Sequence, residues 1–327
     1  MERKTIPNTD ISVSQMGLGT AMIGVKWGKS PAEADEMLGT FLEYGGNLID
    51  TAHVYSDWQE VDGVKEIARS ERLVGDWLQR SGKRNDIILI TKGGHPVFTD
   101  MNCDLHKNRC TREEMCADLD GSLSKLRTDH IDIYMYHRDD PAIPVEEMVE
   151  TMQDFVRQGK IRYWAVSNWK ADRIRAADAY CKKMGYRGPA ADEALMNLGS
   201  KYMAPMPDDT LVYVQRDSGL YDYHLENPDN LLMPYAGIAE GFFQKYIEKG
   251  PEAVKGSPYA VKENIEFAGR IPELMKKYDC SAMNIVLGFF AQEKVDCVPL
   301  YGPRNSRSII DAVKSFDFAF DSEDFAF

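Results

Sequence analysis

The chain lacks the segments that place proteins in membranes or outside the cell. Residues 1–7 carry no apolar run like that of a secretory signal peptide, and no apolar stretch approaches the length of a membrane span. One of the longest apolar stretches, 285–291, has only seven residues. We therefore expect a cytoplasmic protein that does not enter a membrane.

Positive charge is also scarce. The sequence has 39 Lys and Arg residues against 52 Asp and Glu residues, which gives a net charge of −13 at pH 7. An acidic protein repels the phosphates of DNA and RNA, so general binding of nucleic acid is not expected. An anionic ligand would need a local basic pocket instead of an overall positive field.

Cysteine is rare and follows no recognised pattern. There are six Cys residues, and in the absence of a secretion signal we expect free thiols in a reducing compartment. The spacing of Cys and His between 95 and 116 matches no standard zinc site, and a predicted helix start at 111–114 interrupts the group. No metal site is therefore expected. The residues concerned are His95, Cys103, His106, Cys110 and Cys116.

A glycine motif for binding dinucleotides on a doubly wound sheet is missing as well. Gly17 and Gly19 stand in the first predicted strand, but the next glycine is Gly24, so the spacing Gly-x-Gly-x-x-Gly is not met. Hydrophobic residues make up 43% of the chain, which is enough for a sizeable core. A fold other than the doubly wound sheet is therefore favoured.

Eight short, mostly apolar segments alternate with helical patterns along the chain. Such segments are typical of parallel strands that are buried on both faces. Eight strand–helix units without an internal linker predict an α/β protein, a closed (β/α)8 TIM barrel formed by residues 1–327 as a single domain. The expected strands are 15–20, 47–51, 86–92, 130–137, 163–168, 189–195, 231–235 and 297–301.

Several helix starts can be recognised between these strands. Ser30 and Thr111 each precede a glutamate by three residues, which predicts a capping box. The segment 200–230 is long and polar, so the sixth helix is expected to be poorly formed or to begin late, near 217–226. Further helices are expected over 144–159, 261–278 and 306–314.

Four polar residues stand at or just after the ends of predicted strands: Asp50, Tyr55, Lys92 and His137. These strand ends meet at one end of a barrel, where such folds keep their chemistry. An ammonium held charged by Asp50 would lower the pKa of a neighbouring phenol. Tyr55 could then give a proton to a carbonyl oxygen, while His137 hydrogen-bonds the same oxygen. This set suits the reduction of a carbonyl group if another group supplies hydride.

From about Met16 to Val313 the chain resembles the aldo-keto reductase superfamily, in particular bacterial members with His-Arg-Asp-Asp-Pro after the fourth strand. The resemblance implies a (β/α)8 barrel that uses NAD(P)H without a Rossmann domain. It implies that Tyr55 is the acid and base, that Asp50 and Lys92 tune it, and that His137 orients the substrate. The matching segments are Gly17–Thr20, Asp50–Tyr55, Thr91–Gly94, Asp120–Tyr134, His137–Asp140, Gly159–Asn168 and Gly302–Asn305.

The resemblance also implies the cofactor contacts. Ser167 and Asn168 take the positions that bind the nicotinamide carboxamide, and Tyr235 takes the position on which the nicotinamide ring stacks. The loop 236–243 would follow the pyrophosphate, and Arg304 with Arg307 would form a basic pocket at the start of the last helix. The other implied cofactor residues are Gly19, Thr20, Asp50, Glu193, Ala236, Gly237, Ile238, Gly241, Gly302, Pro303 and Ser308.

The chain departs from the family pattern in two regions, the sixth strand and the last helix. Glu193 stands where glutamine is common, and a carboxylate donates no hydrogen bond unless it is protonated. Its negative charge near a positive nicotinamide would favour the oxidised cofactor. Ser308 and Ala312 stand where many NADPH-selective members have arginine and a polar amide, although Arg304 or Arg307 could replace the missing arginine. NADP is the expected cofactor, with NAD as the alternative.

Three functions were compared. The first is an NAD(P)H-dependent carbonyl reductase or alcohol dehydrogenase for a small carbonyl compound or a sugar. The second is a regulatory protein that senses the cofactor, and the complete set of four residues argues against it. The third is a glycosidase with paired carboxylates such as Asp139, Asp140 or Glu193, but the first two are adjacent and diverge. Substrate, reaction direction and oligomeric state are left open. Aromatic loop residues that could line a substrate site are Trp27, His53, Trp58, Trp169, Tyr202, Tyr221 and Tyr223.

Overall fold

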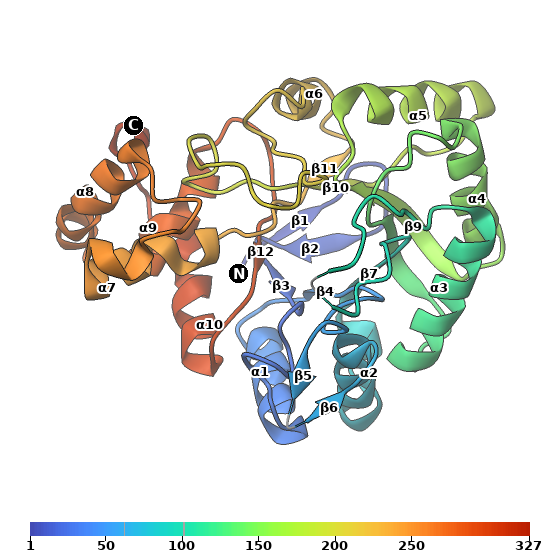
Figure 1. Cartoon of the computed structure of the whole chain (residues 1–327), viewed down its shortest axis with the longest axis horizontal. Helices are drawn as coiled ribbons and strands as arrows, with labels where there is room; N and C mark the ends of the chain where they lie inside the picture. Colours follow the sequence, from blue (N-terminus) through green and yellow to red (C-terminus); the bar gives the residue numbers. More distant parts are fainter. Residues whose placement is uncertain (62, 101) are drawn as a thin grey trace.

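Eight short parallel strands stand side by side around a central axis, with helices outside them (Figure 1). The structure is a computed structural model that describes residues 1–61, 63–100 and 102–327. Each strand pairs in parallel with its neighbours in chain order, and the last strand pairs with the first. The strands are β3 (Gly17–Gly19), β4 (Leu48–Asp50), β7 (Ile88–Gly93), β8 (Ile131–Tyr136), β9 (Ile161–Ser167), β10 (Ala191–Glu193), β11 (Leu231–Leu232) and β12 (Leu300–Tyr301).

The sheet closes between β11 and β12. Leu232 forms a parallel bridge with Cys297, and the amide of Val298 donates to the carbonyl of Leu232 over 2.9 Å. The amide of Leu300 donates to the carbonyl of Pro234 over 2.8 Å. The predicted (β/α)8 barrel is therefore confirmed, although most strands are shorter than the apolar segments that predicted them.

The two helices with predicted capping boxes begin where the sequence placed them. Both predicted capping boxes are formed, with the Ser30 and Thr111 side chains accepting from the amides of Glu33 and Glu114. The α-helices are α1 (Pro31–Glu43), α2 (Arg69–Ser81), α3 (Arg112–Leu126), α4 (Val145–Arg157), α5 (Ala171–Met184), α6 (Leu220–Glu226), α7 (Phe242–Lys249), α8 (Lys262–Tyr278), α9 (Ala282–Gly288) and α10 (Ser306–Val313). Short 3-10 helices cover 84–86, 239–241, 251–254, 289–292, 314–316 and 322–325.

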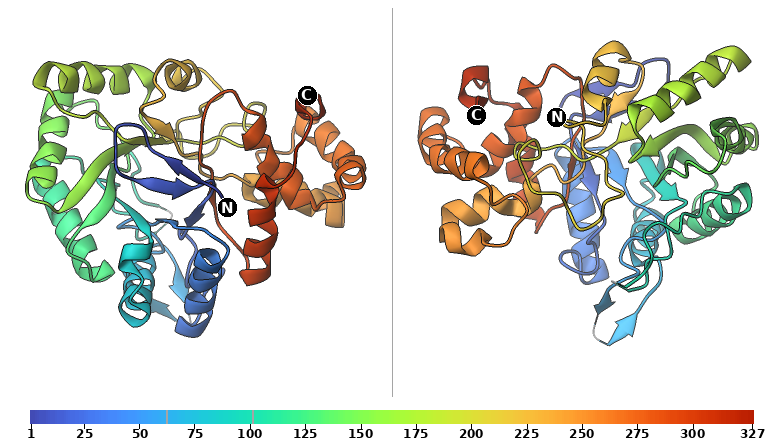
Figure 2. Two further views of the ribbon diagram at one scale, coloured as in Figure 1. Left: turned by 180° about the vertical axis from the view of Figure 1, so that it is seen from behind. Right: turned by 45° about the horizontal axis from the view of Figure 1, so that its top comes forward.

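An N-terminal hairpin, which the sequence patterns did not predict, lies across one end of the barrel (Figure 2). It consists of β1 (Arg3–Thr5) and β2 (Ser12–Ser14). Ile11 and Val13 are fully buried in the same cluster as the inward-facing side chains Ile90 and Ile133 of the barrel. The hairpin therefore closes the barrel at the end opposite to the carboxyl ends of the strands.

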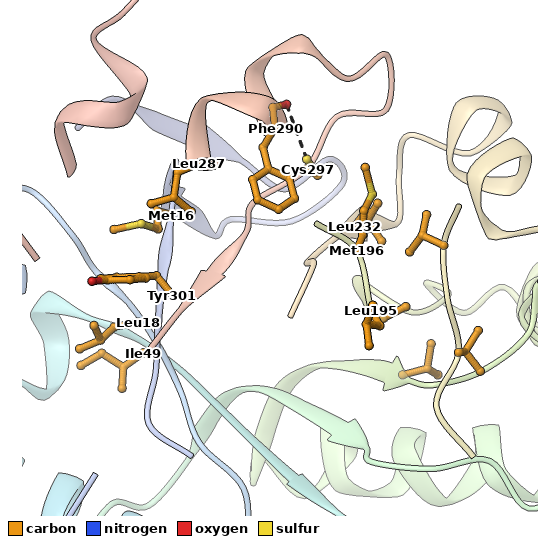
Figure 3. Close-up of a cluster of buried hydrophobic side chains, with 14 of the residues drawn as sticks. Met16, Leu18, Ile49, Leu195, Met196, Leu232, Leu287, Phe290, Cys297 and Tyr301 are labelled. Atoms are coloured by element: carbon orange, nitrogen blue, oxygen red, sulfur yellow. Dashed lines mark hydrogen bonds between the residues drawn. The ribbon is translucent and has the colours of Figure 1, made fainter. Parts of the chain in front are cut away.

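The second and larger core lies between the barrel and its helices. Met16, Leu18 and Tyr301 belong to one cluster with Leu287 of α9, in which Met16 lies next to Leu287 and Leu18 lies next to Ile49 of β4 (Figure 3). These side chains are at most 1% exposed. The strands are thus buried on both faces, which explains why their sequences are almost continuously apolar.

Two regions add to the basic barrel. The sixth helix begins late, at Leu220, as the polar composition of 200–230 predicted. Three helices, α7 to α9, follow β11, and a short hairpin of β5 (Glu60–Val61) and β6 (Val64–Lys65) projects after β4 (Figure 2). Among the described residues no helix is long and apolar enough to span a bilayer.

Candidate active site

Side chains from three neighbouring strands meet at the carboxyl end of the barrel. Asp50 ends β4, Lys92 lies in β7, and His137 directly follows β8, while Tyr55 lies on the loop after β4. The Lys92 ammonium contacts the Asp50 carboxylate and lies 3.0 Å from the Tyr55 hydroxyl. The rings of Tyr55 and His137 pack edge to face, with centroids 5.7 Å apart. The structure therefore brings the four predicted residues together.

Lys92 is completely buried and is the cation of this cluster. Its ammonium donates to the Asp50 carboxylate, to the Tyr55 hydroxyl and, over 3.2 Å, to the carbonyl of Thr51. Burial by itself lowers the pKa of Lys92, but the charges of Asp50 and Glu193 outweigh it, so the pKa is raised. Lys92 therefore stays protonated at neutral pH.

The pKa of the Tyr55 phenol is raised, not lowered. Burial is the main cause, and the carboxylates of Asp50 and Glu193 add to it, while Lys92 opposes it. The predicted net lowering of this pKa is therefore wrong. The charged lysine is where the sequence placed it, but the burial of the phenol and a second carboxylate have the larger combined effect.

His137 is held neutral in the same cluster. Burial lowers its pKa well below the usual value, and the charges of His95, Arg138 and Lys92 lower it further. Its Nδ1 atom has no hydrogen-bond partner among the described residues. The ring of His95 lies against it, with centroids 4.6 Å apart. A neutral imidazole can donate one hydrogen bond to a substrate oxygen without adding a charge to the site.

A cavity of about 660 Å³ lies at this end of the barrel. Asp50, Tyr55 and His137 line it, whereas Lys92 lies behind Tyr55 and does not reach it. Most of the residues that were predicted to bind the cofactor also line this cavity. They are Gly19, Asp50, Ser167, Asn168, Glu193, Tyr235, Ala236, Gly237, Ile238, Gly241, Gly302, Pro303 and Arg304.

Thr20 and Ser308, which were also predicted to bind the cofactor, do not line the cavity. The Thr20 hydroxyl donates to the backbone carbonyl of Asp50 over 2.7 Å and so ties β3 to the end of β4. The Ser308 hydroxyl accepts from the backbone amides of Arg304 and Asn305 over 3.0 and 3.1 Å. Both hydroxyls therefore form hydrogen bonds with backbone groups, and these bonds stabilise the turns that carry the lining residues.

At one side of the cavity, polar groups are already fixed by hydrogen bonds. Asn168 adopts a left-handed backbone conformation with φ of 58°, which asparagine tolerates better than most residues. Its Oδ1 atom accepts from the Tyr235 hydroxyl over 2.7 Å and from the amide of Val212 over 3.1 Å. Its Nδ2 atom donates to the Ser167 hydroxyl over 3.0 Å. The ring of Tyr235 is thereby held at the cavity wall.

Three cations besides Arg138 line the cavity, Lys26, Lys245 and Arg304, and the last two lie beside the same turn. The turn beside them contains Gly241, whose φ is +76°. A Cβ atom at Gly241 would lie 3.3 Å from the Arg304 guanidinium, so a larger residue would be strained and would also crowd this side chain. Arg307 does not line the cavity. A basic pocket thus exists within an acidic protein, with Arg304 as its predicted member.

Glu193 lines the cavity and is part of the buried charge cluster. Its Oε2 atom lies 3.2 Å from Lys92 Nζ but has no partner in hydrogen-bond geometry among the described residues. Burial, together with the charge of Asp50, raises the pKa of Glu193 to about 8. At pH 7 this group is therefore mostly a neutral acid, which can donate as well as accept a hydrogen bond.

Arg138 is a lining residue that the sequence patterns did not single out. It is only 6% exposed, and its guanidinium donates to Thr210 over 3.0 Å and to Asp208 over 3.1 Å. It also donates to the backbone carbonyl of His137 over 2.9 Å. Arg138 thus connects the long loop before α6 to His137. The only sequence signal was its place directly after the candidate histidine.

The aromatic residues expected to contact substrate are mostly elsewhere. Among them only Trp27 lines the cavity. Trp169 is fully buried and donates to the carbonyl of Arg138, and Trp58 packs on Phe98 with ring centroids 4.9 Å apart. The others bond or pack with neighbours outside the cavity: His53, Tyr202, Tyr221 and Tyr223.

The glycosidase alternative loses its carboxylate pair. Neither Asp139 nor Asp140 lines the cavity, and Asp139 is bound to Arg173 over 3.0 Å. Glu193 is left with Asp50 as its carboxylate neighbour, and Lys92 contacts both. Glycoside hydrolysis requires two carboxyl groups that flank the bound sugar. Two carboxylates that both contact one buried cation do not have this arrangement.

A profile of the aldo/keto reductase family matches residues 15–327. The chain belongs to this family. The predicted family resemblance is therefore confirmed, and family membership together with the names of several relatives supports an oxidoreductase activity.

Three relatives illustrate the range of similarity. "Aldo-keto reductase YhdN" of Bacillus subtilis is 34% identical over 53% of this chain and 49% of its own length. "Uncharacterized oxidoreductase YrpG" of the same organism is 24% identical over 99% of this chain and 93% of its own length. An NADP(+) aryl-alcohol dehydrogenase of Phanerodontia chrysosporium is 30% identical over 56% of this chain and 48% of its own length. The alignments at 30% identity or more thus span about half of each relative.

Proposed function

We propose that the protein is an NAD(P)H-dependent oxidoreductase that reduces the carbonyl group of an aldehyde, a ketone or a sugar to an alcohol, and catalyses the reverse oxidation. The observation that carries the proposal is the 3.0 Å contact between Lys92 Nζ and Tyr55 Oη beside His137, at the wall of a large cavity. Membership of the aldo/keto reductase family and the dehydrogenase name of a relative support the same reaction class.

The lining of the cavity fits a nicotinamide dinucleotide. Ser167 and Asn168 offer amide and hydroxyl groups near Tyr55, and the Tyr235 ring offers an aromatic face. Lys26, Lys245 and Arg304 offer positive charge to phosphates. We favour NADP over NAD because an additional phosphate would gain from these cations. Bound in this cavity, the reduced nicotinamide would supply hydride.

In this proposal Tyr55 acts as the general acid. Its raised pKa keeps the phenol protonated at neutral pH, so a proton is always present at Oη. The alkoxide that forms during reduction is a far stronger base than a phenolate, so transfer from Oη remains favourable. Lys92 stabilises the phenolate left behind, because it lies 3.0 Å away and cannot lose its own proton readily. His137 holds the substrate oxygen by a hydrogen bond from a neutral ring.

The test uses Tyr55→Phe, with Tyr136→Phe as a matched control. Tyr136 is also buried, but its hydroxyl donates to the carbonyl of Met148, away from the cavity. Binding of NADPH and NADH is followed by fluorescence, and turnover is measured on a panel of aldehydes, ketones and sugars. We expect Tyr55→Phe to lose about 10²- to 10⁴-fold in kcat with little change in cofactor Kd. Retained turnover in Tyr55→Phe would contradict the proposed role.

A further inference from the structure

Glu193 gives the candidate site one more buried carboxylate than its cation can neutralise. Lys92 is completely buried, and both Asp50 and Glu193 are at most 2% exposed. Two carboxylates and one ammonium would leave one uncompensated negative charge on groups that have little contact with solvent. Such a charge is costly, and proteins usually remove it by protonating one of the acids.

The hydrogen bonds show which carboxylate is left without a proton donor. The ammonium of Lys92 has three protons, and these go to Asp50, to the Thr51 carbonyl and to the Tyr55 hydroxyl. None remains for Glu193, whose Oε2 atom lies 3.2 Å from Lys92 Nζ without hydrogen-bond geometry. Glu193 is therefore the acid that gains most from holding a proton of its own.

The other groups around Glu193 cannot replace this proton with a positive charge. Tyr55 and Tyr235 are neutral phenols with raised pKa values on the same cavity. Asp192, the preceding residue on β10, is a further acid, but its carboxylate is bound to His224 over 3.0 Å. Lys92 is thus the only cation in ion-pair contact with Glu193 in the described part of the chain.

We propose that Glu193 senses the redox state of the cofactor: it is a neutral acid in the empty site and beside the reduced, neutral nicotinamide, and it ionises beside the oxidised, cationic nicotinamide. This inference rests on the proposed function. Glu193 lines the cavity together with Ser167, Asn168 and Tyr235, which form its nicotinamide side. A cation placed there would supply the positive charge that the cluster lacks. Oxidised cofactor would then bind with release of one proton, whereas reduced cofactor would not.

The direction of the pH effect follows from this exchange. Burial and the charge of Asp50 raise the pKa of Glu193 to about 8 before binding, so most of the chains hold the proton at pH 7. Because the ionised form binds the oxidised cofactor better, its Kd should fall as pH rises and should level off above about pH 8. The limiting slope is tenfold in Kd for each pH unit. The Kd of the reduced cofactor should change little over the same range.

The experiment is calorimetric titration of the full chain with NADP⁺ and with NADPH, or with the NAD pair if it binds better. Two buffers of different ionisation enthalpy at pH 7 give the number of protons released. We expect release of most of one proton per chain for the oxidised cofactor and nearly none for the reduced cofactor. Glu193→Gln keeps the size and hydrogen-bonding groups of the acid but cannot ionise, so proton release should disappear. Glu71→Gln, which removes another buried acid with a raised pKa that does not line the cavity, should keep it.

The outcomes separate this inference from the proposed function. Binding of both cofactors without proton release, or equal release from wild type and Glu193→Gln, would overturn the role of Glu193 and leave the oxidoreductase proposal intact. Failure of every nicotinamide cofactor to bind the wild type would overturn both. Should Glu193→Gln not fold, the pH dependence of the two Kd values in wild type decides the question, since parallel curves would also refute the inference.

Discussion

Replacement of Lys92 by methionine would test the buried charge cluster directly. Methionine has a similar length and would fill the space, but it would leave Asp50 and Glu193 facing each other without a cation. Burial already raises the pKa of both acids in the presence of Lys92. Without Lys92 both acids must stay protonated in the folded protein, whereas in the unfolded chain they ionise above about pH 4.

The size of the effect follows from proton linkage. An acid whose pKa is raised by folding stabilises the protein at low pH, and this contribution is lost as pH rises. The pKa of both acids is already raised in the wild type, so the additional loss in Lys92→Met comes from a further rise, mainly in the pKa of Asp50, which accepts a hydrogen bond from Lys92. Each pH unit costs about 1.4 kcal/mol for one acid. Between about pH 5 and about pH 8 the extra loss should reach roughly 3 to 5 kcal/mol, the usual cost of breaking a buried ion pair.

The measurement is urea unfolding followed by tryptophan fluorescence at several pH values. The control Lys4→Met removes a partly exposed lysine from its contact with Asp296 and should change stability by less than about 1 kcal/mol at any pH. The double variant Lys92→Met/Asp50→Asn should lose the additional pH dependence. If Lys92→Met and wild type showed the same pH dependence of the free energy of unfolding, the cluster would not hold the charges assigned to it.

Four further predictions concern other parts of the molecule. Gly241→Ala should weaken NADPH binding several-fold and lower stability by about 1 kcal/mol, because φ is +76° and Arg304 is close; unchanged Kd by fluorescence titration would contradict this. Asp208→Asn should raise KM and speed proteolysis of the loop before α6, because the ion pair with Arg138 is lost; an unchanged digestion rate would count against it. Ile11→Ala should lower the free energy of unfolding by about 2 to 4 kcal/mol, because it leaves a cavity between the N-terminal hairpin and the barrel interior, and it should not change cofactor Kd. A loss of stability below about 1 kcal/mol would show that the hairpin is dispensable. The rate of alcohol oxidation should increase with pH throughout the range in which the protein is folded, because the base is the Tyr55 phenolate and its raised pKa keeps this form scarce until high pH. A plateau of the rate near neutral pH would indicate another base.

The sequence by itself determined the barrel and the position of its candidate site. Eight apolar segments that alternate with helical patterns could be read as strands buried on both faces, and capping boxes at Ser30 and Thr111 marked helix starts. These signals are local, since each depends on residues within a few positions of one another. Asp50, Lys92 and His137 were found because the ends of parallel strands in a barrel always lie at the same end.

Only the tertiary structure decided the electrostatics and the walls of the cavity. The pKa of Tyr55 depends on burial and on Glu193, which stands 138 positions away in the chain and reaches Lys92 from a different strand. The N-terminal hairpin was missed because its two strands have three residues each and are stabilised by the distant interior of the barrel. The sequence did not indicate which aromatic loop residues face the cavity and which pack against a neighbour. Trp27 lines the cavity, whereas Trp169 is fully buried outside it. Burial and electrostatic energy are sums over neighbours in space, and residues far apart in the chain become neighbours only when the barrel closes.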